Sequence, residues 1–457
     1  MLTLWGKQRS FCDTLSRRDF LRVGALGFGG LTLPDLYRLR AQEPARAERE
    51  QKAIIMIGLP GGPSQFEMYD LKPDAPEGIR GEFKPIQTNV PGMAISELFP
   101  LQAQIADQLA IVRGVNFYFD DAHSQQLIYT GYGRPDNVGA PIPGRMRRPA
   151  FGSVFSRLRG SSTAEGMPSY VSMIRSTAEG NGDGENPAYA GAAHRAFCYD
   201  GPILKNLQPT KDVSLERLAD RKELLRGFDT LQRDIDVRGQ IAGMDAHAAR
   251  AFDLLTSPKV RQAFDVSKEP ESVRAKYGKI ANKGEAGSVD PDKLLMARRL
   301  VEAGVSVVTL QVGGWDDHGS AKEGGIFNNL RKRLPVLDRA LYGLLTDLKE
   351  RGLDKHVTVL MWGEMGRTPK INNAPGRDHW ADSGFAFFAG GAGMPMGQVI
   401  GETDARGERA KGKRYTVQNV LATVYNVLGI DPASTIPDHT GRPQYLLDER
   451  EPITELV

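Results

Sequence analysis

The stretch "GVSVVTLQVGGWDDHG", residues 304–319, joins an apolar run to a cluster of acids and a histidine. The run "VSVVTLQV" (305–312) is rich in β-branched residues and nearly continuous in its apolar character, as is typical of a strand buried on both faces of a parallel sheet. Asp316 and His318 follow where that strand would end. Ligands bind open parallel sheets at this edge, so the stretch predicts an α/β fold and a candidate site together.

Five further runs have the same composition and alternate with longer helical patterns. They are residues 53–59, 109–115, 169–174, 357–362 and 385–390. Helices are expected at residues 295–304 and 334–352, because leucines of the second segment recur every three or four positions and Gly352 supplies a stop. This alternation predicts an α/β domain over residues 50–457, with a mostly parallel central sheet flanked by helices. Residues 211–287 are charged and helical in pattern, which predicts a helical insertion.

The N-terminal part of the chain contains "SRRDFLR" (16–22), followed by the apolar, glycine-rich residues 23–33. This segment resembles a twin-arginine export signal, and we expect residues 1–41 to be the signal peptide. The apolar part is shorter than the roughly 20 residues that span a bilayer, so no transmembrane segment is expected. An amphipathic helix with a basic start is the alternative. The resemblance implies export by the twin-arginine machinery to the periplasm or beyond the cell.

Charge and cysteine content exclude two classes of function. The formal net charge of the 457-residue chain is +3. Residues 1–41 hold seven Lys/Arg and three acids, so the remaining chain carries about −1. A basic surface for nucleic acid is therefore not expected. The two cysteines, Cys12 and Cys198, cannot form a disulfide framework or a four-sulfur zinc site.

Histidines and acids gather in the loops that follow the predicted strands. Three of the seven histidines, His123, His318 and His379, lie in such loops. Because the carboxyl ends of parallel strands share one edge of a sheet, these side chains are expected to meet there. The prediction fails if His318 and His379 lie more than roughly a dozen ångströms apart, since two ligands of one ion have bonds near 2 Å.

The pieces "GGPS" (61–64), "YTG" (129–131), "WDDHG" (315–319), "GEMGRTP" (363–369) and "GRDHW" (376–380) occur in the order found in an exported bacterial family known as domain of unknown function 1501. The chain resembles this family over nearly all of the part after the signal. The family is placed by similarity in the alkaline phosphatase and sulfatase superfamily. The resemblance implies an alkaline phosphatase-like α/β fold, with one or two divalent metals held by Asp and His at strand ends.

The superfamily pattern, carried over, gives Asp316, His318 and His379 as the ligands of one metal, with Glu364 as a further ligand. Three ligands with an open position indicate a catalytic site, and N/O donors suit zinc or manganese. Calcium is the alternative if Asp316, Glu364 and Asp378 converge. In a purely structural reading, Asp316 instead caps a helix or pairs with an arginine. The "Glu-Met" at residues 364–365 replaces the Asp-His of a second metal site, so a single metal or none is expected.

The sequence offers several candidates for the nucleophile of the predicted site. Counting back from "TG" (130–131), the nucleophile position of sulfatases falls on Asp121, so the oxidisable cysteine of an ordinary sulfatase is absent and Asp121 is the candidate at that position. His123 could act as acid or base, and Ser124 could bind substrate. Ser64, preceded by two glycines, is another candidate nucleophile, although a tight turn also explains "GGPS".

Arg367 and Arg377 are predicted to bind an anion, because guanidinium groups fork onto phosphate, sulfate or carboxylate. Pairing with Glu364 or Asp378 is their alternative role. The sequence thus predicts an exported metal-assisted hydrolase of a small anionic ester or of a sulfated or phosphorylated polysaccharide. The rival hypothesis is a catalytically silent member of the fold that binds glycan or another envelope component.

Overall fold

The computed structural model describes residues 52–118, 123–133, 136–137, 140–141, 147–163, 166–174, 184–199, 258–279, 288–320, 325–391 and 393–457. The predicted signal peptide, residues 1–41, lies outside the described residues. So do residues 211–257 and 280–287 of the predicted helical insertion. The described part of that segment, residues 258–279, contains the short helices α11 (Pro258–Ala263) and α12 (Glu271–Tyr277).

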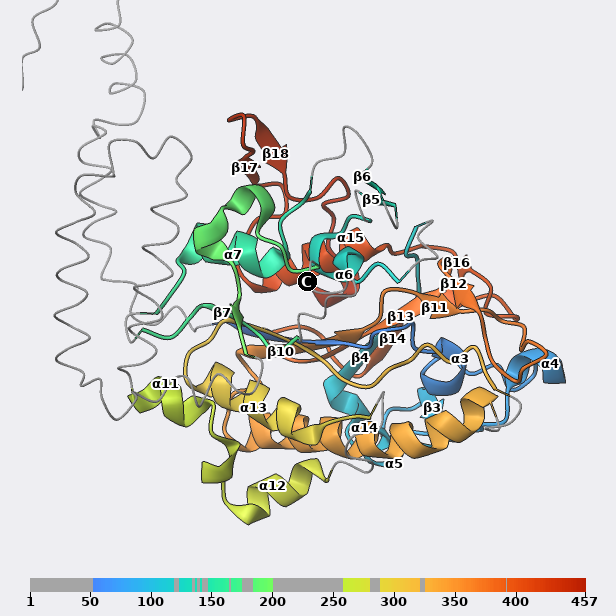
Figure 1. The fold of residues 1–457 in the computed structure, drawn as a ribbon. Helices are drawn as coiled ribbons and strands as arrows, with labels where there is room; N and C mark the ends of the chain where they lie inside the picture. Colours follow the sequence, from blue (N-terminus) through green and yellow to red (C-terminus); the bar gives the residue numbers. More distant parts are fainter. Residues whose placement is uncertain are drawn as a thin grey trace, which may run out of the picture. The chain divides into compact units, whose positions relative to one another are not determined.

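The core of residues 52–457 is an eight-stranded sheet in the order β14-β4-β13-β10-β1-β9-β7-β8 (Figure 1). Every neighbouring pair is parallel except those that involve β13, which runs antiparallel to both β10 and β4. The strands are β1 (Ala53–Gly58), β4 (Leu109–Val115), β7 (Tyr170–Ser172), β8 (Phe197–Cys198), β9 (Val307–Gln311), β10 (Val357–Trp362), β13 (Gly384–Gly390) and β14 (Gln398–Ile400).

Helices cover both faces of the sheet, below and above it in Figure 1. The lower layer contains α5 (Pro100–Ala103), α13 (Pro291–Glu302) and α14 (Gly325–Glu350), together with α11 and α12. The upper layer contains α6 (Gln126–Thr130), α7 (Phe151–Arg159) and α15 (Val417–Val427). The short α3 (Gln65–Met68) and α4 (Glu77–Arg80) lie near one end of the sheet in Figure 1.

A hydrophobic core lies between the sheet and the helices on each of its two faces, which explains the composition of the strands. Along β1, Ile55 and Ile57 pack into the core beneath the sheet, whereas Ile54 and Met56 pack into the core above it. A strand with apolar neighbours on both faces needs no polar alternation. The α/β class predicted from the sequence, with a mostly parallel sheet flanked by helices, is therefore confirmed.

Short hairpins lie outside the main sheet. They pair β2 (Pro85–Gln87) with β3 (Ala94–Ser96), β5 (Asp136–Asn137) with β6 (Ala140–Pro141), β11 (Gly366–Arg367) with β12 (His379–Trp380), β15 (Glu402–Thr403) with β16 (Ala410–Lys411), and β17 (Thr435–Pro437) with β18 (Pro443–Tyr445). The β11–β12 pair matters for function because it contains Arg367 and His379.

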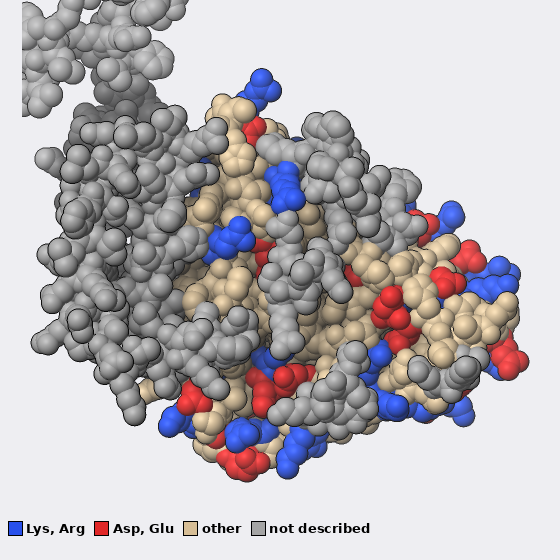
Figure 2. Space-filling model, viewed as in Figure 1, with Lys and Arg blue, Asp and Glu red and all other residues tan. Residues whose placement is uncertain are grey.

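The described surface carries charges of both signs. On the face shown in Figure 2, basic and acidic side chains are interspersed. Several of the surface charges pair with one another, among them Lys276 with Glu350 and Arg351 with Glu302, the latter at 2.7 Å. No helix within the described residues combines the length and the apolar character needed to cross a membrane.

Candidate metal centre

The candidate site lies where β10, β1 and β9 end side by side. Gly58, the last residue of β1, is in register with Trp362 of β10 and with Gln311 of β9. The segments after β9 and β10 supply Asp316, His318 and Glu364. His379 reaches the same edge by a different route, because it precedes β13, and an antiparallel strand starts where its parallel neighbours end.

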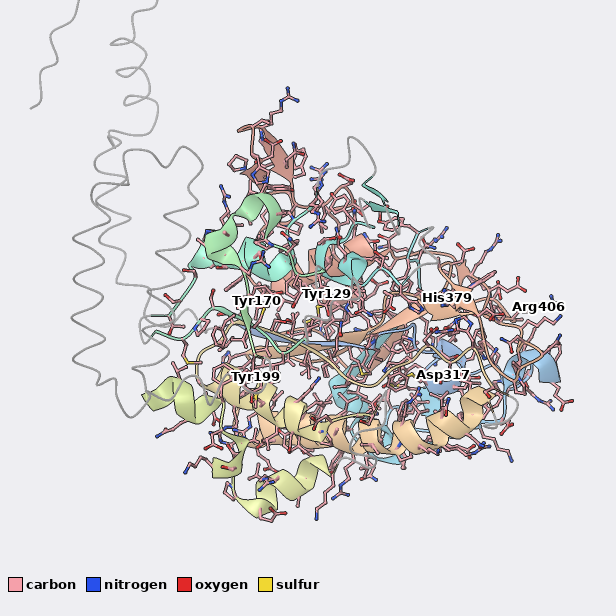
Figure 3. All side chains as sticks on the ribbon, in the orientation of Figure 1. Tyr129, Tyr170, Tyr199, Asp317, His379 and Arg406 are labelled. Atoms are coloured by element: carbon pink, nitrogen blue, oxygen red, sulfur yellow. The ribbon has the colours of Figure 1, made fainter. Side chains whose placement is uncertain are left out.

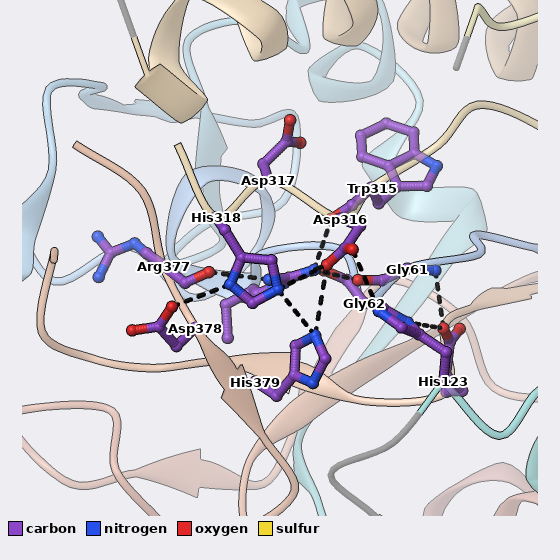
Figure 4. A network of polar contacts seen from close by, with 12 residues as sticks. Gly61, Gly62, His123, Trp315, Asp316, Asp317, His318, Arg377, Asp378 and His379 are labelled. Atoms are coloured by element: carbon purple, nitrogen blue, oxygen red, sulfur yellow. Dashed lines mark hydrogen bonds and ion pairs between the residues drawn. The ribbon is translucent and has the colours of Figure 1, made fainter. Parts of the chain in front are cut away.

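Four side chains meet at this edge (Figure 4). One ligand atom from each of His123, Asp316, His318 and His379 lies within 4.8 Å of all the others. Nε2 of His318 is 2.9 Å from Oδ1 of Asp316 and 3.0 Å from Nε2 of His379. Nε2 of His379 is 3.3 Å from the same Oδ1, whereas His123 approaches Oδ2 of Asp316 at 3.2 Å. Residues from three distant loops thus form one cluster.

These donors fit a zinc-like divalent ion. Ligands bound to zinc at about 2.1 Å with tetrahedral angles lie about 3.4 Å apart, close to the separations in the cluster. Three imidazoles and one carboxylate match the ligand types of zinc and similar transition metals. The side chains are between 21% and 48% exposed, so a molecule from solvent can reach them. We call these four residues the His/Asp cluster.

Two carboxylates orient the imidazoles of His318 and His123 by contacting the ring nitrogen that faces away from the cluster. Oδ1 of Asp378 is 2.9 Å from Nδ1 of His318, and Oε1 of Glu364 is 3.2 Å from Nδ1 of His123. The backbone N–H of Gly61 also donates to that oxygen of Glu364, at 2.7 Å. A carboxylate behind a metal-binding histidine fixes its tautomer and raises its basicity. His318 and His123 therefore both present Nε2 to the cluster.

Glu364 and Asp378 each contact a histidine of the cluster, His123 and His318 respectively. Glu364, which was predicted as a metal ligand, is 1% exposed, and its Oε1 contacts His123 and Gly61. Calcium was expected only if three carboxylates converged. Calcium prefers oxygen donors, whereas the cluster offers three imidazole nitrogens and one carboxylate.

The environment of the cluster shifts two pKa values in opposite directions. Burial raises the pKa of Asp316, but the hydrogen bond from Arg367 and the charges of His123, Arg367 and His318 outweigh burial and bring this pKa to about 2. The hydrogen bond with Glu364 raises the pKa of His123 above its usual value, and the charge of Asp316 adds to this effect. The carboxylate of Asp316 is therefore ionised at neutral pH, as a metal ligand must be.

Arg367 positions Asp316 rather than reaching solvent. Its side chain is 0% exposed, and all three guanidinium nitrogens donate hydrogen bonds. Nε donates to the carbonyl of Gly62 at 2.7 Å, and Nη1 donates to that of Arg377 at 2.8 Å. Nη2 donates to Oδ1 of Asp316 at 2.7 Å and to the carbonyl of Trp315 at 3.0 Å. The predicted binding of a substrate anion is incompatible with this burial.

Arg377 is buried in the same way, on the side of the loop away from the cluster. Its Nη2 donates to Oε1 of Glu67 at 2.7 Å and to the carbonyl of Ile79 at 2.7 Å. Nη1 donates to the carbonyls of Thr368 and Pro369. Arg377 is 0% exposed and Glu67 is 1% exposed. This ion pair fastens the "GRDHW" loop to α3, so the structure assigns Arg377 to loop positioning and not to anion binding.

The predicted serine sites are also buried. Ser64 is 2% exposed, and its hydroxyl donates to Glu67. Ser124 is 1% exposed, and its Oγ has no hydrogen-bond partner among the described residues. Asp121, which was also predicted as a catalytic residue, lies outside the described residues. Neither serine lies in the His/Asp cluster, which leaves His123 as the predicted catalytic residue that the structure brings into it.

Close backbone approach explains two glycines of the site. A Cβ atom on Gly61 would lie 2.5 Å from the backbone nitrogen of Asp316, and one on Gly376 would lie 2.0 Å from the carbonyl carbon of His318.

Asp317 lies on the other side of the loop from the cluster (Figure 3). Its carboxylate accepts hydrogen bonds from Asn329 and Arg333 of α14, at 2.9 and 2.7 Å. Adjacent acids thus point in different directions, Asp316 to the cluster and Asp317 to the helix.

Several solved structures are similar to the chain. The lipoteichoic acid synthase LtaP from Listeria monocytogenes matches with a TM-score of 0.41 and 10% identity, over 87% of this chain and 88% of its own. The PsFucS1 sulfatase from Pseudoalteromonas sp. matches with a TM-score of 0.38 and 10% identity, over 86% and 70%. The phosphonate monoester hydrolase of Agrobacterium radiobacter matches with a TM-score of 0.38 and 10% identity, over 86% and 78%.

None of the curated proteins matches the sequence. The sequence model of DUF1501, described as a protein of unknown function, matches residues 51–457. These residues include every strand of the sheet and all four members of the His/Asp cluster. The chain therefore belongs to the DUF1501 family.

Proposed function

We propose that this protein is a metal-dependent hydrolase of phosphate or sulfate esters. The observation that supports the proposal is the convergence of four ligand atoms from His123, Asp316, His318 and His379 within 4.8 Å of one another. Asp316, His318 and His379 would hold a zinc or manganese ion. When bound, such an ion neutralises negative charge on the ester oxygens.

Residues of the chain would orient the metal ligands and leave the site accessible to a substrate. Arg367 and Asp378 fix Asp316 and His318 by hydrogen bonds of 2.7 and 2.9 Å. His123 is 35% exposed and faces the ligand group, so it can contact a bound ester. A small ester and an ester on a polysaccharide are both compatible with this exposure, and we propose both as substrate classes.

Binding without turnover is the second candidate function. The burial of Ser64 and Ser124 and the engagement of Arg367 and Arg377 support it, because a hydrolase of anionic esters commonly uses such groups. In that case the protein would bind glycan or another envelope component and would not cleave it.

A screen of aryl phosphate, phosphodiester and sulfate esters with added zinc, manganese or calcium separates the two functions. The hydrolase is expected to cleave at least one class with zinc or manganese, and a His318→Ala variant is expected to lose this activity. The matched control is His439→Asn, since His439 is exposed and lies against Tyr189 instead of the cluster. Stable, metal-loaded protein that cleaves none of the esters would support binding.

We also propose that the protein is exported by the twin-arginine machinery, on the strength of "SRRDFLR" at residues 16–22. Such export carries folded cargo, which suits a protein that acquires its metal before export. Replacing Arg17 and Arg18 with lysine is expected to retain the protein in the cytoplasm, as measured by cell fractionation. Unchanged export of this double variant would contradict the proposal.

A further inference from the structure

We propose that Asn372 is a positioning residue of the metal centre, which holds His318 and the carboxylate of Asp378 in the geometry that binds the ion. The inference rests on the proposed function, since it concerns a ligand of the same ion. It adds a residue that lies outside the motifs of the sequence, in the segment between β11 and β12. The argument depends on the hydrogen bonds at the two ends of the Asn372 amide.

The side-chain nitrogen of Asn372 contacts two oxygens beside the predicted ligand His318. Nδ2 donates to the carbonyl oxygen of His318 at 3.0 Å and to Oδ1 of Asp378 at 3.1 Å. The same Oδ1 lies 2.9 Å from Nδ1 of His318. An amide NH2 group has two hydrogens, one for each acceptor. One side chain therefore holds both the backbone of His318 and the carboxylate that orients its ring.

The side-chain oxygen of Asn372 closes a turn. Oδ1 accepts from the backbone N–H of Ala374 at 2.9 Å and from that of Gly376 at 3.0 Å. The backbone N–H of Asn372 donates to the carbonyl of Gly376 at 2.8 Å. This turn packs directly on the loop that carries His318, because a Cβ atom on Gly319 would lie 1.9 Å from the carbonyl oxygen of Ala374.

The partners of Asn372 determine the orientation of its amide. Backbone N–H groups only donate, whereas carbonyl and carboxylate oxygens accept. Exchanging the two ends of the amide would place its oxygen against the oxygens of His318 and Asp378, and its NH2 group against the N–H groups of the turn. A side chain at this position therefore needs both a donor and an acceptor, which asparagine supplies.

Asp378 depends on such a partner because its side chain is 55% exposed. An exposed side chain keeps its rotamer freedom unless a neighbour holds it, and ordering it costs entropy. The backbone N–H of Asp378 donates to Oγ1 of Thr368 at 2.9 Å, which fixes the main chain but not the carboxylate. Asn372 holds the carboxylate in place before an ion binds, so less ordering is needed on binding.

Asn372→Asp separates the two functions of the side chain. The variant keeps an oxygen for both hydrogen bonds to the turn, but an acceptor replaces the donor that faces His318 and Asp378. Asn372→Ala removes both functions. Asn373→Asp is the matched control, since it makes the same substitution at the exposed neighbouring residue.

The test is the Kd of the full-length protein for zinc, measured by competition with a chelator, together with urea denaturation of the metal-free protein. We expect Asn372→Asp to raise the Kd by about tenfold, with a urea midpoint close to that of the wild type. Asn372→Ala is expected to raise the Kd similarly and also to lower the midpoint. Asn373→Asp is expected to match the wild type in both measurements.

Two further readouts distinguish positioning from a role in the fold alone. In an Asp378→Ala background, Asn372→Asp is expected to raise the Kd by less than about threefold, because the residue through which it acts is already absent. Cobalt(II) bound in place of zinc reports the arrangement of the ligands through its visible absorption. Asn372→Asp is expected to change that spectrum, whereas Asn373→Asp is not.

Three results would overturn the positioning role. The first is an Asn372→Asp protein with the Kd and the cobalt spectrum of the wild type. The second is an Asn372→Asp protein that fails to fold or loses as much stability as Asn372→Ala, since the turn alone would then explain any change in Kd. The third is an equal rise in Kd with and without Asp378. In all three the wild type still binds zinc and the proposed function stands, whereas a wild type that binds no metal would refute both.

Discussion

Nε2 of His318 lies 3.0 Å from Nε2 of His379, although the two residues are 61 positions apart in the sequence. His318 follows the parallel strand β9, and His379 precedes β13. Because β13 runs antiparallel to β10, its start lies at the edge where β9 ends. The antiparallel direction of β13 therefore brings His379 next to His318.

Removing the carboxylate behind His318 is expected to weaken metal binding. Asp378 accepts from Nδ1 of His318 at 2.9 Å, and loss of such a partner typically costs about 10–100-fold in metal affinity. Asp378→Asn should therefore show a Kd for zinc that is higher by that factor, measured by competition with a chelator. A Kd equal to that of the wild type would show that Asp378 does not support the ligand.

Glu364→Gln is the matched comparison, because Glu364 supports His123 instead of His318. If Asp316, His318 and His379 hold the ion without His123, this variant should keep the zinc affinity of the wild type within a few-fold. A fall in zinc affinity as large as that of Asp378→Asn would instead assign His123 to the metal.

The buried ion pair of Arg377 and Glu67 is expected to contribute to the free energy of unfolding. Both side chains are at most 1% exposed, and removing one partner of a buried pair leaves the other charge uncompensated. Arg377→Leu should lower the free energy of unfolding by about 3–5 kcal/mol, measured by urea denaturation. The control Arg406→Leu changes an arginine that is 65% exposed and should stay within about 0.5 kcal/mol of the wild type. Equal losses in the two variants would contradict this account.

Asp347 is expected to make stability fall in acid. Burial raises its pKa, but hydrogen bonds from Arg351 and Tyr277 and the charge of Arg298 outweigh burial and leave the pKa below its usual value. A carboxyl with a lowered pKa stabilises the fold in full above its unfolded pKa of about 3.9, and this stability is lost as the pH falls through the folded value. Asp347→Asn should therefore lose stability less steeply below about pH 4 than the wild type, in denaturation curves at several pH values. Equal slopes would refute the assignment.

The sequence predicted the parts of this structure that depend on local pattern. All six predicted strands belong to the sheet, because apolar β-branched runs mark strands that are buried on both faces. The helix predicted at residues 334–352 is α14, although it begins at Gly325 and contains Pro335 in its interior. Strands β8 and β14 were missed, since two or three residues form no recognisable pattern.

Partners that are distant in the sequence could not be predicted in the same way. The antiparallel direction of β13 depends on the path of residues 363–383, which composition does not reveal. Arg377 and Glu67 are 310 positions apart, so nothing local indicates that the arginine is buried against that acid and not free for an anion. The assignment of His123 to the cluster depends likewise on β4 ending at the same edge of the sheet as β9.

The central claim is that Asp316, His318 and His379 together hold one divalent ion. Its most direct test is the metal content of full-length protein purified after native export, determined by elemental mass spectrometry. The account predicts about one zinc or manganese per chain in the wild type and in His439→Asn, and essentially none in an Asp316→Ala, His318→Ala double variant that remains folded. Wild-type protein that is stable but takes up no metal, or a double variant that retains it, would contradict the account.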